Sequence, residues 1–330
     1  GRPSMASGWS VLRASGDEPE PRGGHTALLV EKNLLLMGGS QHKGQGKFVY
    51  FSLDPHVLNT QTLQWFKPRV ALGKGPAPRS YHTATRVGSH LFIFGGQTEK
   101  LKGSSSVLGD MPVFDLVRMA WETRDARGKQ PRPRYWHTAS LVNSKIFIAG
   151  GHSGVQSLSD VHVLDTEALT WSQPELMGSP LPSLASHTAT IVGERLYFFG
   201  GMSVTLDEDG GSNVKYEDDV HVLHCETMSL ERLRRRGTQP AARAYHQATL
   251  VGGYLLVLGG WSGRAHGLNE LSTLDLEGLG SWYSVQVPGQ APSAVYGHSA
   301  TLIGSKVVMF GGWDGVSPLN SVHVLDTTLL

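Results

Sequence analysis

The chain has 330 residues, a formal net charge of +1 and one cysteine; 39% of its residues are hydrophobic and 17% are charged. This composition is typical of a globular protein, and the near-neutral charge argues against a field that would draw the whole chain to nucleic acid or an anionic membrane. No apolar run approaches the roughly 20 residues of a membrane-spanning helix, and we expect no secretory leader. The 41 glycines and 17 prolines indicate many tight turns and short strands, so we expect an all-β fold.

The first residues are expected to lie outside the fold. Gly1 to Ser4 stand before Met5 and are interpreted as a cloning remnant, so residues 1–8 are assigned to a tail. The segment GWSVLRA follows and carries Trp9, which precedes His25 by 16 residues. This segment is expected to form a strand.

From His25 onward, one unit is repeated six times. In each copy a histidine precedes a Gly-Gly pair by 13 residues: His25 with Gly38, His82 with Gly95, His137 with Gly150, His187 with Gly200, His246 with Gly259, and His298 with Gly311. The intervening text, such as HTATRVGSHLFIFGG from His82, predicts a strand, a two-residue turn and a second strand. The second strand is so uniformly apolar that we expect neither of its faces to be exposed to solvent. Repetition at this period indicates a repeat architecture.

Each copy continues into a third strand and, in most copies, a tryptophan. The segment DVHVLDTEALTW ends at Trp171, related segments end at Trp65, Trp121 and Trp282, and Leu230 takes this place in the fourth copy. The step from this position to the next histidine is 16 or 17 residues. The distance from Gly-Gly to this position varies from 21 to 30 residues, so one loop per copy varies while the scaffold does not. Variable loops on one face of a repeat array often form its binding face.

The sixth copy stops at SVHVLDTTLL, short of its tryptophan, whereas Trp9 stands before the first copy at the regular spacing. We therefore expect the N-terminal strand to complete the last blade. Such pairing closes the ring and removes the exposed strand edges of an open array.

The paired glycines after a hydrophobic strand, followed by a spaced tryptophan, resemble the kelch repeat over residues 9–330. The resemblance implies a six-bladed kelch β-propeller in which four antiparallel strands form each blade around a central channel. The expected blades cover about 22–68, 79–124, 134–174, 184–234, 243–287, and 295–330 with 9–14. Propellers host binding, scaffolding and catalysis alike, so the fold does not choose the function.

The residues that recur in every copy are expected to be structural. Six equivalent histidines around a ring lie too far apart to converge on one metal ion, and we expect their ring nitrogens to bond to the backbone. The tryptophans are expected to pack between adjacent blades, with Leu230 making the fourth blade the loosest joint. The paired glycines permit backbone geometry that a Cβ would forbid.

The positions that flank the repeated histidines and paired glycines change from copy to copy and form the candidate ligand-binding site. The kelch resemblance implies that the loop entering the first strand and the loop leaving the second meet at the channel mouth. The entering positions are Tyr81, Trp136, Ser186, Tyr245 and Tyr296, and the exit positions are Ser40, Gln97, His152, Met202, Trp261 and Trp313. Aromatic anchors among adaptable polar groups are typical of a recognition surface. The alternative is that these rings only plug the channel.

Four arginines stand three residues before a histidine: Arg22, Arg79, Arg134 and Arg243. If they point to the channel mouth, they form an anion-binding ring suited to an acidic side chain or a C-terminal carboxylate. If they instead stack between blades, they only hold the fold together. The residues alone do not choose between these two arrangements.

The longest variable loop, within 206–219, carries six carboxylates, and Arg232 and Arg234–236 follow it. A solvated acidic loop with a basic neighbour is one interpretation and a calcium site is another, although the spacing fits no EF-hand.

The leading hypothesis is a protein- or peptide-binding module that works without cofactor, metal or nucleic acid. Kelch resemblance supplies two contexts, the substrate receptor of a ubiquitin-ligase-type assembly and an adaptor. The alternative is an enzyme of the kelch-like sugar mutarotase type, although no nucleophile, P-loop or dinucleotide motif occurs. A copper-radical oxidase site is not expected, because Cys225 should lie away from the channel mouth. A lone, inert thiol fits a reducing compartment, so a monomeric cytoplasmic protein, which could also be nuclear, is expected.

Overall fold

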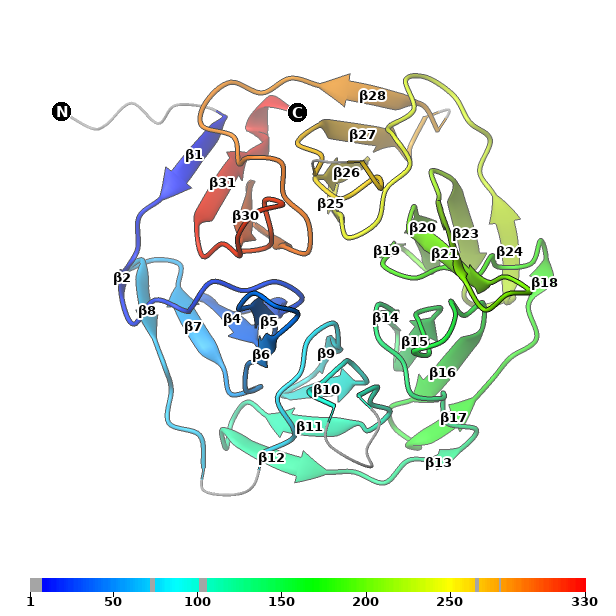
Figure 1. Cartoon of the computed structure of the whole chain (residues 1–330), viewed down its shortest axis with the longest axis horizontal. Coiled ribbons are helices and arrows are strands. Elements are labelled where there is room, and N and C mark those ends of the chain that lie inside the picture. The colour runs from blue at the N-terminus through cyan, green and yellow to red at the C-terminus, as the bar shows by residue number, and fades with distance from the viewer. Residues whose placement is uncertain (1–7, 72–74, 101–105, 265–266, 279) are drawn as a thin grey trace.

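The structure is a computed structural model that describes residues 8–71, 75–100, 106–264, 267–278 and 280–330. The tail assigned to residues 1–8 falls outside the described chain except for Gly8. Six sheets are arranged around one axis as a closed disc, and the first and last strands, β1 (Trp9–Leu12) and β31 (Val322–Asp326), belong to the same blade (Figure 1). The described residues contain no helix with the length and apolarity needed to cross a bilayer.

Every blade is a four-stranded antiparallel sheet whose first strand lies nearest the axis. Blades 1 to 3 are built from β3 (Thr26–Val30), β4 (Asn33–Met37), β7 (His56–Asn59) and β8 (Gln64–Phe66); β9 (Thr83–Val87), β10 (His90–Phe94), β11 (Pro112–Asp115) and β12 (Ala120–Thr123); β14 (Thr138–Val142), β15 (Lys145–Ala149), β16 (Val161–Asp165) and β17 (Thr170–Ser172). Blades 4 to 6 are built from β19 (Thr188–Val192), β20 (Arg195–Phe199), β23 (Val220–His224) and β24 (Ser229–Arg232); β25 (Gln247–Val251), β26 (Tyr254–Leu258), β27 (Leu271–Asp275) and β28 (Trp282–Val285); β29 (Ser299–Ile303), β30 (Lys306–Phe310), β31 (Val322–Asp326) and β1 (Trp9–Leu12).

The N-terminal strand closes the ring, as the sequence predicted. Strand β1 pairs antiparallel with β31, with Trp9 opposite Leu325 and Leu12 opposite Val322. A short 3-10 helix, η1 (Thr327–Leu329), follows β31. Because the first and last strands share one blade, unfolding of either end would open the ring.

A hydrophobic cluster fills each of the six joints between neighbouring blades, and the tryptophans lie in these clusters as expected. Trp65 packs on Phe310 across the joint of blades 1 and 6, with ring centroids 5.5 Å apart. Trp171 contacts Phe94 in the same way at the joint of blades 2 and 3. In the fourth blade Leu230 takes this place and is buried with residues of blade 3. The second strands of the blades, buried from their second residue onward, supply the largest share of each cluster.

The link between blades adds a short parallel strand outside three of the sheets: β2 (Ser15–Gly16) on β8, β13 (Arg127–Gly128) on β17 and β18 (Met177–Gly178) on β24. In each of these three links a glycine stands seven residues after the tryptophan position, as Gly128 does after Trp121. Gly128 has φ +88°, and a Cβ there would lie 2.1 Å from the carbonyl oxygen of Trp171. Only glycine fits this close approach of two backbones.

Candidate functional site

The channel mouth is framed by the residue that precedes each repeat histidine: Gly24, Tyr81, Trp136, Ser186, Tyr245 and Gly297. Their backbones form a closed circle of six hydrogen bonds. The amide of Tyr81 donates to the carbonyl of Gly24 at 2.7 Å, and the circle continues through the blades until Gly24 donates to Gly297 at 2.9 Å. We call these six residues the mouth ring.

All six mouth-ring residues have a left-handed backbone. The two glycines have φ +66°, and the four others have φ between +55° and +59°. A residue with a side chain pays roughly 1 kcal/mol or more for this conformation, whereas glycine pays almost nothing. Four blades therefore carry a side chain at a position where the backbone favours glycine.

Three aromatic side chains of the mouth ring meet over the channel. Trp136 lies edge-on to Tyr81 and to Tyr245, with ring centroids 5.5 and 5.2 Å apart, and the two tyrosines are 6.4 Å apart. All three side chains are only partly buried. Burial raises the pKa of the Tyr81 and Tyr245 hydroxyls, so both remain neutral phenols. The rings thus narrow the channel and also form an aromatic floor on the outer face.

The entering and exit positions do meet on one face, because antiparallel bridges join them in every blade. The bridged pairs are Gly23 with Ser40, Ser80 with Gln97, Tyr135 with His152, Ala185 with Met202, Ala244 with Trp261, and Tyr296 with Trp313. Tyr296 therefore corresponds to Ser80, Tyr135 and Ala244 of other blades, one residue before the mouth-ring position. Gly297 occupies the mouth-ring position in blade 6. Tyr296 still contacts Trp261, with ring centroids 5.1 Å apart. His152 is buried against Trp136.

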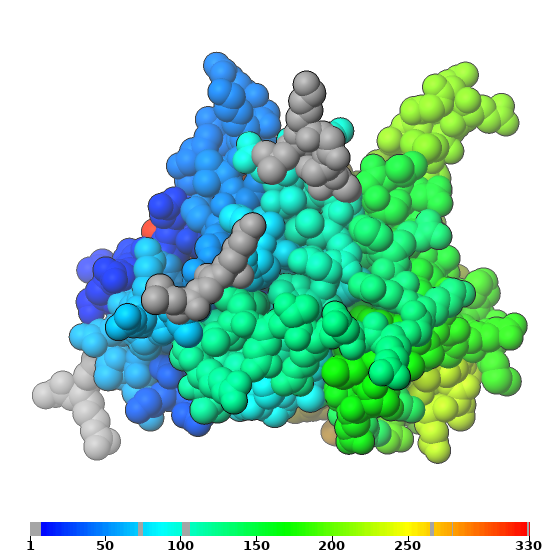
Figure 2. Space-filling view, turned by 90° about the horizontal axis from the view of Figure 1, so that it is seen from below, coloured from blue at the N-terminus to red at the C-terminus, as the bar shows by residue number. Residues whose placement is uncertain are grey.

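Two long hairpins rise from the same face. Strands β5 (Ser40–His42) and β6 (Phe48–Tyr50) extend blade 1, and β21 (Met202–Leu206) and β22 (Ser212–Tyr216) extend blade 4. Blades 1 and 4 lie opposite each other in the ring (Figure 1), and the hairpins project as the blue and yellow-green extensions of Figure 2. Phe48 and Leu206 are exposed on them. The hairpins therefore form two walls around the aromatic floor.

The four arginines do not reach the channel mouth, which corrects the placement expected for an anion-binding ring. Arg79, Arg134 and Arg243 have no exposed side-chain surface, and Arg22 is 6% exposed. The guanidinium of Arg134 donates to Gly150 O at 2.8 Å and to both carboxylate oxygens of Asp160 at 2.6 and 2.9 Å. Arg79 binds Gly95 O and Asp110 in the same way, and Arg243 pairs with Glu270. Arg22 lacks such a carboxylate among the described residues and stacks on Phe51.

The physical reason is that the backbone of each of these residues also bonds to the preceding blade. The carbonyl of Arg134 accepts a hydrogen bond from Gly96 of blade 2, while its side chain bonds within blade 3. This double attachment fixes the arginine inside the wall. The arginines thus adopt the second of the two arrangements open from the sequence.

The repeat histidines line the channel, and five of them link neighbouring blades through side-chain hydroxyls. The expected bonds to the backbone apply to His187 with Leu184 and to His246 with Phe199. In the five linking histidines Nε2 lies 2.9–3.1 Å from a threonine or serine hydroxyl of the preceding blade, as in the pair of His82 with Thr26. The hydroxyl belongs to the residue that directly follows the repeat histidine of the preceding blade, as Thr26 follows His25. Burial lowers the pKa of His82 to about 3, so the ring stays neutral. The repeated His-Thr pair, visible in the sequence, was the signal that could have found this link.

A cavity of about 320 Å³ occupies the channel below the mouth ring. The mouth-ring residues line its top, and the six histidines and the residues after them line its wall. No arginine of the expected ring contributes to this lining.

The acidic loop is partly neutralised by its basic neighbours. Asp219 lies 2.7 Å from both Arg232 and Arg235, and Asp218 also pairs with Arg235. These contacts correspond to the solvated, charge-paired interpretation rather than to a calcium site.

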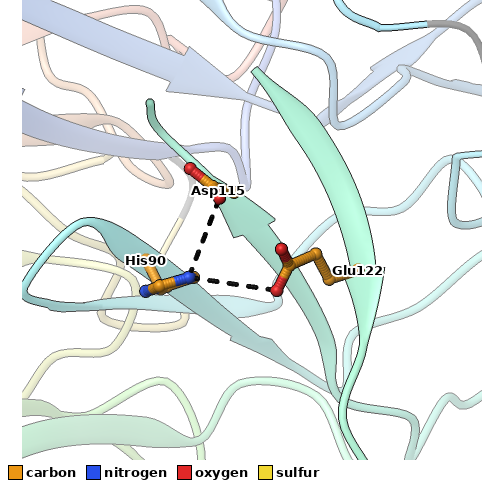
Figure 3. Close-up of side chains that lie close together, drawn as sticks. All are labelled: His90, Asp115 and Glu122. Atoms are coloured by element: carbon orange, nitrogen blue, oxygen red, sulfur yellow. Dashed lines mark ion pairs between the residues drawn. The ribbon is translucent and has the colours of Figure 1, made fainter. Parts of the chain in front are cut away.

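Within the described residues, one group of three side chains has metal-ligating atoms close together: His90, Asp115 and Glu122 on the outer part of blade 2 (Figure 3). Nε2 of His90 lies 3.9 Å from a carboxylate oxygen of each acid. Arg118 lies within 3.7 Å of both carboxylates, and Arg124 is 3.3 Å from Glu122. The arginines already supply the positive charge that a cation would bring, so we assign no metal here.

The lone thiol lies away from the channel mouth. Cys225 follows β23 and is buried in the cluster between blades 3 and 4. Burial raises the pKa of the Cys225 thiol to about 11, which keeps it protonated and unreactive near neutrality.

These features define a closed kelch propeller, and comparison with known proteins gives the family. A family model described as the KLHDC2/KLHL20/DRC7 Kelch-repeats domain matches residues 5–201 and 207–330, so the chain belongs to this kelch-repeat family.

Three relatives illustrate the similarity. The chain is 28% identical to acyl-CoA-binding domain-containing protein 4 of Arabidopsis thaliana over 89% of its length. It is 27% identical to host cell factor 1 of Homo sapiens over 92% of its length and 26% identical to human host cell factor 2 over 95%. The chain spans 34%, 12% and 42% of these three proteins, respectively.

Proposed function

We propose that this propeller binds segments of other proteins on the face that carries the mouth ring. The aromatic floor of Tyr81, Trp136 and Tyr245 would hold an apolar side chain of the partner, and the β5–β6 and β21–β22 hairpins would flank the bound segment. Kelch-repeat membership and the similarity to the host cell factors support a protein-interaction role.

The backbone of the mouth ring is the observation that carries this proposal. Tyr81, Trp136, Ser186 and Tyr245 keep their side chains at φ values that favour glycine, although Gly24 and Gly297 show that the ring closes equally well with glycine. Strain of this kind persists where the side chain has a use that outweighs its cost. Large, rigid aromatic side chains at a partly exposed mouth are typical binding hot spots.

Partner chemistry follows from the groups around the floor. Gln97, His152, Met202, Trp261 and Trp313 surround it with neutral hydrogen-bonding and apolar groups. The preference for acidic or C-terminal carboxylate ligands depended on arginines at the mouth, and the proposal leaves it out because those arginines are bonded inside the blades.

A selection from a displayed library of random linear peptides tests the proposal. We expect peptides with a conserved apolar or aromatic residue to be enriched, and their affinity to fall at least about tenfold when Tyr245 is changed to glycine. Glycine relieves the backbone strain and thereby offsets part of the lost packing, so the variant should remain folded. Tyr283→Ala is the matched control, because Tyr283 is half-exposed on β28, away from the channel. Peptides that bind Tyr245→Gly and wild type equally would show that the mouth is not the binding face.

We propose that this face serves the substrate receptor of a ubiquitin-ligase-type assembly or an adaptor. We also propose that the protein works as a monomer in the cytoplasm or nucleus. The buried thiol of Cys225 is compatible with a reducing compartment. Fluorescence imaging of the tagged protein would test the location, affinity purification with wild type against Tyr245→Gly the role, and the molar mass in solution the monomeric state.

A further inference from the structure

The ring of histidine links around the channel has one break. Five histidines bond through Nε2 to the hydroxyl of a threonine or serine in the preceding blade. The sixth, His298, faces blade 5, where Gln247 stands in place of that threonine. Neither ring nitrogen of His298 has a hydrogen-bond partner among the described residues, and Gln247 beside it is partly buried.

The unpartnered imidazole is buried and lines the cavity. His298 is 2% exposed, and both His298 and Gln247 belong to the wall of the 320 Å³ cavity. Leaving a buried polar group without a hydrogen-bond partner destabilises a fold, and both ring nitrogens lack one at this joint, whereas Nε2 has one at the other five. Burial also lowers the pKa of His298 to about 3, so the ring is neutral at physiological pH and offers one donor and one acceptor.

The mouth is open directly above this joint. Gly297 precedes His298 in the mouth ring, and a Cβ built on Gly297 would contact only the amide nitrogen of Gly24, at 3.9 Å. Gly24, the other glycine of the ring, is covered by the ring of Tyr81. Trp136, across the mouth, also has a buried Nε1 that lacks a partner within the described part of the chain.

From this arrangement we infer that His298 and Gln247 form a hydrogen-bonding site for one neutral hydroxyl or carboxamide group, which enters the channel past Gly297. Hydroxyl and carboxamide groups both donate and accept, so either can satisfy a neutral imidazole and the Gln247 amide together. The hydroxyls of Thr26, Thr83, Thr138, Thr188 and Ser299 show the same chemistry at the five intact joints. A bound peptide would supply the group from a Ser, Thr, Asn or Gln side chain, and this part rests on the proposed function. A small free amide or polyol would supply it without a peptide.

Gln247→Thr is the variant that isolates the site, because it restores the hydroxyl that the other joints have. Thr188→Ser is the control, because it keeps the hydroxyl that bonds to His246 and leaves the blade 5–6 joint unchanged. Both variants exchange small polar groups in a wall position and are expected to fold as wild type does.

The first measurement follows the ring nitrogens of His298 by long-range 1H–15N NMR with selectively labelled histidine. Acetamide and glycerol are the free probes, and a peptide from the displayed library is the second source. We expect the His298 resonances of wild type and Thr188→Ser to shift with acetamide or the peptide, whereas those of Gln247→Thr stay unmoved. The inference is overturned if no probe shifts His298 more in wild type than in Gln247→Thr.

The second measurement is a double-mutant cycle on the selected peptide. Replacing its Ser, Thr, Asn or Gln by alanine should weaken binding about tenfold to wild type, the loss expected for one hydrogen bond of 1–1.5 kcal/mol, and little to Gln247→Thr. Equal losses in both proteins contradict the site while leaving peptide binding at the mouth intact. Failure of the library to yield peptides that depend on Tyr245 contradicts the proposed function, and the acetamide and glycerol titrations then decide the site alone.

Discussion

Replacing Arg134 by leucine tests directly whether the buried arginines hold the blades together. The change removes two hydrogen bonds to Asp160, one to Gly150 O and one to Arg132 O. Removing one partner of a fully buried ion pair costs about 3–5 kcal/mol, and because the Asp160 side chain is 20% exposed we expect a smaller loss, about 2–3 kcal/mol. Blade 4 shows how the fold accommodates leucine: Leu184 takes the arginine's place, and Asp219 turns to Arg232 and Arg235.

The free energy of unfolding from urea titrations measures this loss. Arg132→Leu is the control, because Arg132 is exposed, and it should change stability by less than about 0.5 kcal/mol. The double variant Arg134→Leu with Asp160→Asn also removes the charge of the Asp160 carboxylate. Its free energy of unfolding should therefore lie within about 1 kcal/mol of that of wild type. If Arg134→Leu lowers the free energy of unfolding no more than Arg132→Leu does, the arginines are not structural links. Loss of peptide binding in such a stable variant would then indicate that the arginines belong to the binding site.

The stability difference between wild type and Arg134→Leu should also depend on pH. Burial alone would raise the pKa of Asp160, but hydrogen bonds from Arg134 and His162 outweigh it and hold the pKa well below its usual range. A carboxyl with a depressed folded-state pKa stabilises the fold above its unfolded pKa of about 3.9, and this contribution disappears as pH falls through the folded value. In Arg134→Leu only His162 still opposes the effect of burial, so the pKa of Asp160 rises and protonation removes the poorly compensated charge. The difference should therefore be largest near pH 7 and shrink toward pH 4; a difference that grows on acidification would contradict this account.

Three further predictions concern the scaffold. Trp9→Ala should lower the free energy of unfolding by about 3–5 kcal/mol in urea titrations, because Trp9 is buried where β1 closes the ring; a loss below about 1 kcal/mol would argue against closure by this strand. Gly128→Ala should destabilise more than Gly88→Ala in the same assay, because both glycines have positive φ but a Cβ meets the Trp171 carbonyl only at Gly128; equal losses would leave strain as the sole cause. Cys225 should react with a thiol reagent at pH 8 roughly a hundredfold more slowly in the folded than in the urea-unfolded protein, because burial raises its pKa to about 11; comparable rates would show the thiol to be accessible.

Sequence reasoning located the candidate site but not the orientation of its side chains. The kelch resemblance implied that the entering and exit positions meet at the channel mouth, and the bridges between them in every blade agree with this. The orientation of Arg134 does not follow from the sequence, because its carbonyl and its guanidinium bond to different blades that meet only in the folded ring. The register of Tyr296 was missed for a related reason: Gly297 occupies the mouth-ring place, and a glycine shows no side chain from which its role could be inferred.

The sequence by itself determined the six-bladed architecture, the closing role of the Trp9 strand and the burial of the tryptophans, because these depend on periodicity and apolar pattern repeated six times. Only the tertiary structure decided which polar groups are satisfied. The substitution of Gln247 for threonine can be read in the chain, yet its consequence for His298 exists only because residues 51 positions apart become neighbours across a joint. Local pattern fixes strands and turns, whereas hydrogen-bond partners are set by the contacts between blades that ring closure creates.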